Sequence, residues 1–134
     1  AKLQDKVSTQ KYYFIDNGLL NLFLLDPETS LLENLTAIYL HEKYGEDLYY
    51  YNDHVEVDFC LFEHGKAFQV SYSLQDATTR ERETKALIAY AKRYDCSRSY
   101  IITMDEEEKI QQDGFTIHVV PIWKLLLIPH ATQG

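Results

Sequence analysis

Polar residues that could bind a metal ion or a polar ligand fall on one face of a predicted β-hairpin. Residues 55–72 alternate strictly between apolar and polar types, a pattern typical of two paired strands. Because side chains alternate across a strand, one face must be core. That predicted core face carries Val57, Phe59, Leu61, Phe68, Val70 and Tyr72. The other face carries Glu56, Asp58, Gln69, Ser71 and Ser73.

The turn of this hairpin determines which residues face one another. His64-Gly65 stands where a two-residue loop is needed, and glycine accepts the positive φ that such loops demand. The register expected from this loop pairs Glu63 with Lys66, Phe59 with Val70, and Asp58 with Ser71. A carboxylate and several hydrogen-bonding groups then lie together at the centre of a sheet.

Helices and further strands must position the hairpin. Asp26-Pro27 and Gly45 indicate the start and the stop of a helix that ends at about Tyr44. A strand over 48–51 precedes the hairpin, and Thr78 with Glu81 forms a capping box before a helix that ends near Tyr94. The remaining predictions are strands 99–103 and 115–120, an exposed acidic turn over 105–108, and a closing helix over 122–128.

The predicted fold is α/β, with a mixed sheet between helices. The strand at 68–73, the helix at 79–94 and the strand at 99–103 form a crossover, which places those two strands parallel in one sheet. With 134 residues, the chain is expected to form one domain over 1–134, with 1–10 as a leader and 129–134 as a tail.

The overall charge argues against a free-standing protein that grips a nucleic acid backbone. The net charge is −8, and the one dense basic group is interleaved with acids on the helix 79–94, so we expect a solvated face. The two cysteines form no CxxC pair and are expected to be free thiols. Without an apolar leader or membrane span, the chain is expected to be cytoplasmic and to have no membrane partner.

Three short motifs in this order resemble the restriction-endonuclease-like, or PD-(D/E)XK, nuclease superfamily. They are an acidic residue on a first helix (Leu-Leu-Glu33-Asn-Leu), Glu56-Val-Asp58-Phe on a strand, and Gln69-Val-Ser71 on the next strand. Together with Lys11-Tyr-Tyr-Phe-Ile-Asp16-Asn-Gly-Leu they are similar to the C-terminal domain of unknown function of bacterial and archaeal AAA-type ATPases. The resemblance spans residues 11–125 and implies a restriction-endonuclease-like sheet, an antiparallel meander plus a parallel crossover, flanked by helices.

The resemblance implies a metal site with a degenerate third motif. Active superfamily members hold one or two Mg²⁺ ions between a helix Glu, a strand Asp and a Glu-x-Lys, and the metal activates the attacking water. Glu33 and Asp58 match the two acidic positions, while Gln69 replaces the Glu and Ser71 replaces the Lys. The implied Mg²⁺ or Mn²⁺ ligands are Glu33, Asp58 and Gln69, and Lys85 on the following helix is the candidate for the missing lysine.

Simpler structural roles stand beside these catalytic ones. Glu33 could be a solvated helix residue, and Asp58 could be satisfied by a backbone N–H or a tyrosine hydroxyl. Gln69 and Ser71 could serve only to hydrogen-bond that carboxylate, which would leave a fossil of a nuclease site without metal.

Three functions therefore remain open at the level of the sequence. The first is an inactive or weakly active nuclease-like module of an AAA-type ATPase that docks DNA or its own N-terminal ATPase domain. The second is an active Mg²⁺- or Mn²⁺-dependent DNA endonuclease, and the third is a protein-interaction domain without a nucleic acid role. The chain has no glycine-rich phosphate loop, so we do not expect this part of the protein to bind ATP as an ATPase does.

Overall fold

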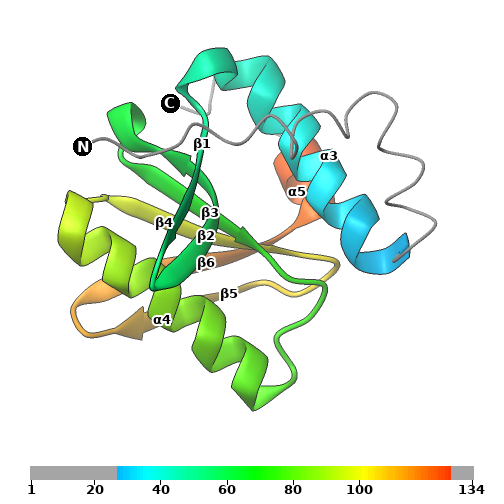
Figure 1. Ribbon diagram of the computed structural model, residues 1–134. Helices are drawn as coiled ribbons and strands as arrows, with labels where there is room; N and C mark the ends of the chain where they lie inside the picture. Colours follow the sequence, from blue (N-terminus) through cyan, green and yellow to red (C-terminus); the bar gives the residue numbers. More distant parts are fainter. Residues whose placement is uncertain (1–26, 128–134) are drawn as a thin grey trace.

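A six-stranded mixed sheet with helices on both faces forms the body of the protein (Figure 1). The computed structural model describes residues 27–127, with side chains from Leu31 onward. The predictions for the leader 1–10, the motif at 11–19 and the tail 129–134 lie outside these residues. The elements are α3 (Pro27–Tyr44), β1 (Tyr49–Asp53), β2 (Val55–Leu61), β3 (Lys66–Val70), α4 (Ala77–Tyr94), β4 (Arg98–Thr103), β5 (Glu108–Gln112), β6 (Phe115–Pro121) and α5 (Ile122–Leu127).

The strands are ordered β1-β2-β3-β4-β6-β5 across the sheet. β1, β2 and β3 form an antiparallel meander, while β3 runs parallel to β4 and β4 parallel to β6. This confirms the predicted α/β class, the mixed sheet and the parallel pair on either side of α4. The prediction of an exposed acidic turn over 105–108 missed β5, which begins at Glu108 and pairs antiparallel with β6. Only Ile110 of this edge strand is buried. The sequence of β5 therefore lacks the alternation of apolar and polar residues that indicates a strand.

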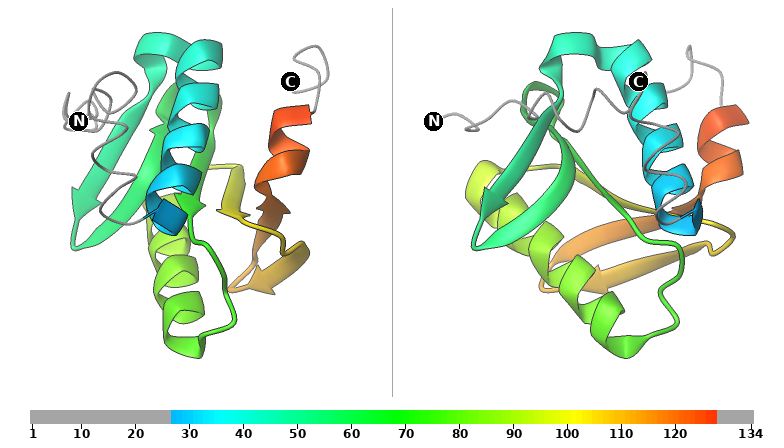
Figure 2. Two further views of the ribbon diagram at one scale, coloured as in Figure 1. Left: turned by 90° about the vertical axis from the view of Figure 1, so that its right-hand side faces the viewer. Right: turned by 45° about the vertical axis from the view of Figure 1, so that its right-hand side comes forward.

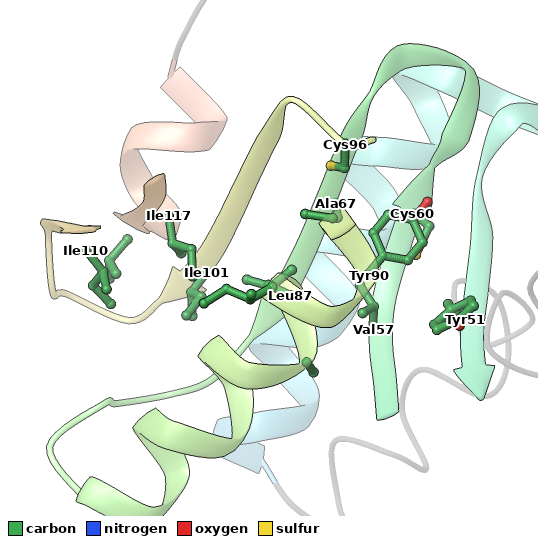
Figure 3. Close-up of a cluster of buried hydrophobic side chains, with 14 of the residues drawn as sticks. Tyr51, Val57, Cys60, Ala67, Leu87, Tyr90, Cys96, Ile101, Ile110 and Ile117 are labelled. Carbon is green, nitrogen blue, oxygen red and sulfur yellow. The ribbon is translucent and has the colours of Figure 1, made fainter. Parts of the chain in front are cut away.

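Each face of the sheet has its own apolar core. Figure 2 shows α4 on one side of the sheet and both α3 and α5 on the other. On the α4 side, Leu87 and Tyr90 pack against Val57, Ala67 and Ile101, as Figure 3 shows. On the α3 side, Leu32 and Leu40 belong to a second cluster with Phe59, Phe68 and Ile122. Within the described residues, no helix is long and apolar enough to cross a membrane.

The helix boundaries were mostly predictable. α3 ends at Tyr44, and Gly45 adopts a positive φ of 56°, as expected for a glycine stop. α4 ends at Tyr94 as predicted, but its N-cap is Asp76 rather than Thr78. The Asp76 carboxylate accepts a hydrogen bond from the Thr79 N–H at 2.8 Å. An aspartate two residues earlier is the stronger cap and adds part of a turn to the helix.

The predicted two-residue turn is wrong. Phe62–His64 forms a short 3-10 helix, and Gly65 follows it in the left-handed conformation with φ 66°. Leu61 therefore pairs with Lys66, and Phe59 pairs with Phe68 rather than with Val70. The expected pairings of Glu63 with Lys66 and Asp58 with Ser71 fail for the same reason. A four-residue loop shifts the register by two residues relative to a two-residue loop.

The predicted division of β2 into one apolar and one polar face is also wrong. Tyr49 pairs with Cys60, whereas Tyr51 pairs with Val57, so β2 contains one extra residue between these pairs. This irregularity places Val57 and Cys60 in the α4-side core, while Phe59 lies in the α3-side core. Both faces of the hairpin are thus covered by a helix. Cys60 and Cys96 are both free thiols, as expected, and both are buried.

Candidate functional site

The candidate site lies at a fork between β2 and β3. The two strands pair through Leu61 with Lys66, Cys60 with Ala67 and Phe59 with Phe68. Beyond Phe59 this backbone pairing ends, and the next contacts are made by the side chains of Asp58 and Gln69. Two of the predicted site residues therefore replace main-chain hydrogen bonds where the strands separate.

Gln69 supplies two of the hydrogen bonds across the fork. Its side-chain carbonyl Oε1 accepts from the Asp58 N–H at 2.9 Å, and its Nε2 donates to the Glu56 carbonyl at 2.9 Å. The side chain is almost fully buried, with 1% of its surface exposed. A buried amide with both ends bonded to backbone is the arrangement that polar burial requires. Gln69 holds the β2 backbone rather than the Asp58 carboxylate.

A third hydrogen bond across the fork joins the Asp58 side chain on β2 to the backbone of β3. Its carboxylate Oδ2 accepts from the Val70 N–H at 2.9 Å, and Val70 is itself buried. A carboxylate that accepts a backbone N–H makes a charge-assisted hydrogen bond, stronger than one between neutral groups. A backbone N–H is one partner that the sequence offered for Asp58, and the Val70 N–H is such a partner. This bond joins the side chain of β2 to the backbone of β3.

Acidic residues from two elements gather around Tyr50 of β1. Burial, a hydrogen bond to Glu56 and the negative charges of Glu56, Asp58 and Glu33 raise the pKa of Tyr50 to about 12. Glu33 comes from α3, whereas Glu56 and Asp58 come from β2. The negative charges of Glu33 and Asp58 therefore both contribute to the raised pKa of this tyrosine.

The titration of Tyr50 tests this convergence. We expect the difference in ultraviolet titration between the wild type and Tyr50→Phe to show one tyrosine with a pKa of about 12, against an ordinary 10.0. Glu33→Gln should move that pKa downward, because one negative charge is removed. Glu42→Gln on the same helix serves as the matched control. An unchanged Tyr50 pKa in Glu33→Gln would place Glu33 away from the site.

A cavity of about 610 Å³ opens beside the fork on the α4 side. Asp58, Gln69 and Lys85 all line it, so the structure brings three of the predicted site residues together. Lys85 is exposed on α4, whereas Glu33, on α3, does not line this cavity. Ser71 does not line the cavity, and its hydroxyl donates to the Ser73 carbonyl at 2.9 Å.

Two acids in this cavity were not among the predicted site residues. Glu56 and Glu83 line it, and burial together with the charge of Glu56 raises the pKa of Glu83 against the opposing effect of Arg82. Glu56 stood on the polar face in the sequence pattern. Glu83 lies in a run of alternating charges on α4. Nothing in the sequence distinguishes it from the solvated residues of that run.

Three of the five basic residues of α4, all of them arginines, are paired with the protein's own acids. Arg80 makes two hydrogen bonds with Glu108, at 2.7 and 3.0 Å, and Arg82 lies 3.3 Å from Glu83. Arg93 lies 2.9 Å from Asp53. These pairs agree with the predicted solvated face and disfavour a phosphate-binding stripe on this helix.

Polar atoms at the fork that could ligate a metal already accept backbone hydrogen bonds. Mg²⁺ requires near-octahedral oxygen ligands, normally including carboxylates that are free to coordinate. Here Asp58 Oδ2 and Gln69 Oε1 each accept a backbone N–H, and Gln69 carries no charge. Within residues 27–127, no group of three His, Cys, Asp or Glu side chains could hold a metal ion.

Comparison with known proteins finds no matching family model, no matching curated protein and no matching solved structure.

Proposed function

We propose that this chain is a restriction-endonuclease-like module that has lost cleavage and serves an AAA-type ATPase as a docking module. The observation that carries the proposal is the reciprocal bonding of Asp58 and Gln69 at the fork. The positions that resemble metal ligands here act as structural hydrogen-bonding groups. The antiparallel meander, followed by α4 and a parallel strand, is the arrangement that the resemblance implies.

The favoured partner is the ATPase domain of the same protein rather than DNA. The arginines Arg80, Arg82 and Arg93 are paired with carboxylates, so the positive charge of α4 outside these pairs is limited to Lys85 and Lys92. Apolar side chains are exposed instead on α5, where Trp123 is 54% and Leu126 is 43% exposed. Several exposed apolar groups on one helix are typical of a protein-binding surface.

A cleavage assay tests the loss of catalysis. Supercoiled plasmid is incubated with the wild type and with Asp58→Ala, in Mg²⁺ and in Mn²⁺. We expect no cleavage above background in either protein, because the Asp58 carboxylate and the Gln69 carbonyl are engaged with backbone. Cleavage by the wild type that disappears in Asp58→Ala would instead establish the active endonuclease.

A binding assay tests the docking role. The coding sequence upstream of Ala1 should encode an ATPase domain, and this chain should bind that domain when the two are produced separately. Trp123→Ser should weaken binding, whereas Met104→Ser, an equally apolar exposed position on the β4–β5 connection, should not. The absence of an upstream ATPase domain, or salt-sensitive retention on DNA without domain binding, would contradict this assignment.

A further inference from the structure

The sheet ends at β5, a regular strand at one of its two edges. In the strand order β1-β2-β3-β4-β6-β5 it pairs with β6 on one side, and no other described strand lies beyond it. An edge strand leaves the N–H and C=O groups of every second residue pointing away from its neighbour, where another strand can pair with them. This edge is therefore a candidate surface for the addition of a strand.

β5 lacks most of the features that block the edge of a sheet. Natural proteins protect such edges with proline, β-bulges and charged side chains, lysine above all. β5 contains no proline, and its five residues pair with β6 in unbroken register, from Glu108 with Val119 to Gln112 with Phe115. Glu108 already bonds Arg80 of α4, at 2.7 and 3.0 Å. Lys109 is thus the charged residue of β5 that an added strand must accommodate.

A second copy of the same strand fits this edge. Two copies related by a two-fold axis bring identical surfaces together, and their edge strands then run antiparallel. Ile110 belongs to the apolar core on the α4 side of the sheet in each copy. A continuous sheet requires residues of the same face to lie opposite one another, so the register between the copies can shift only in steps of two residues.

Charge and backbone conformation select one of these registers. If Lys109 lay opposite Lys109 of the second copy, like charges would face one another and destabilise the pairing. If Gln111 lay opposite Gln111 of the second copy, the pairing would run into the turn at Asp113, which has a positive φ of 54°. With Ile110 opposite Ile110, all five strand residues pair.

The register centred on Ile110 places no like charges opposite one another within the strand. Lys109 faces Gln111 of the second copy, and Glu108 faces Gln112, each of these pairs occurring twice by symmetry. Beyond the strand Glu107 approaches Asp113 of the second copy, but the charge of Glu107 is paired with Lys124. Amide side chains opposite charged ones are compatible with hydrogen bonds across the interface.

We propose that β5 pairs with β5 of a second copy in the antiparallel register centred on Ile110, so that two six-stranded sheets form one continuous sheet. Five residue pairs make a small interface, so the dimer is weak and forms at high protein concentration. The residues of β5 are distinct from those of the fork and from Trp123 of α5. Loss of either the dimer or the docking function would therefore leave the other standing.

Sedimentation equilibrium of the 134-residue chain, from micromolar to millimolar concentrations, measures the dissociation constant of the dimer. Gln111→Glu places a carboxylate opposite Lys109 of the second copy, whereas Gln111→Lys places an ammonium group there. Each substitution changes two symmetric pairs. We expect Gln111→Glu to tighten the dimer about fivefold and Gln111→Lys to weaken it about fivefold. Gln111 is exposed, so both variants are expected to fold.

The same substitutions at Gln112 are the matched control. Gln112 faces Glu108 of the second copy, so the signs reverse: Gln112→Lys should tighten the dimer and Gln112→Glu should weaken it. Both effects should be smaller than at Gln111, because Glu108 is already paired with Arg80. General repulsion between copies of net charge −8 predicts instead that glutamate weakens association at both positions. That pattern, or a wild type that stays monomeric at every concentration, would overturn the dimer.

Discussion

Gln69→Ala is expected to destabilise the protein by about 3 kcal/mol, because it leaves two buried backbone groups without partners. The Asp58 N–H and the Glu56 carbonyl both depend on this side chain at the fork. For a domain of this size, such a loss lowers the melting temperature by about 10 °C. Thermal unfolding followed by circular dichroism measures it. Gln111→Ala, at an exposed position on β5, is the matched control and should have little effect.

Gln69→Glu separates the structural role from the catalytic one. A glutamate restores the acidic residue of the superfamily motif, but as a carboxylate it cannot donate to the Glu56 carbonyl. We expect burial to raise the pKa of the introduced group, so that the variant is most stable at low pH and loses stability as the pH rises through that pKa. Stability at neutral pH equal to that of the wild type would contradict the assigned hydrogen bonds.

Asp58→Ala is expected to destabilise the metal-free protein by about 2 kcal/mol, because the buried Val70 N–H loses a charged acceptor. If the Asp58 carboxylate served only as a metal ligand, Asp58→Ala would instead stabilise the metal-free protein. Several acids crowded without metal repel one another, so removal of one would then stabilise the protein. Denaturant unfolding in the presence of a chelator distinguishes the two signs. Asp105→Ala, at an exposed position, provides the control for the loss of one charge.

Local signals predicted most of the elements. Proline and glycine marked the ends of α3, and the second long helix ends at Tyr94, near where the sequence placed its end. The succession of strand, helix and strand predicted the parallel pairing of β3 with β4. These features depend on short stretches of chain, which is why the sequence alone was sufficient for them.

The register of the hairpin could not be predicted in the same way. A shift of two residues leaves every side chain on the same face of its own strand, so alternation does not distinguish the two loops. The run Phe59-Cys60-Leu61 also concealed the irregularity in β2, because apolar residues are compatible with either covered face. Both features depend on tertiary contacts with α3 and α4.

Three of the five residues named from the sequence line one cavity, but the hydrogen bonds that two of them make were not predicted. Asp58, Gln69 and Lys85 line one cavity, and Glu33 acts with Asp58 on Tyr50. The sequence could not show that Gln69 is almost fully buried with both ends of its amide bonded to β2. That bonding depends on the separation of two strands, which no residue pattern encodes.

The melting temperatures of the wild type and Asp58→Ala, each measured in a chelator and in Mn²⁺, test the central claim most directly. A structural fork predicts a lower melting temperature for Asp58→Ala in both conditions and no shift of the wild type with Mn²⁺. A wild-type protein that Mn²⁺ stabilises, together with an Asp58→Ala variant that is more stable without metal and indifferent to Mn²⁺, would contradict it.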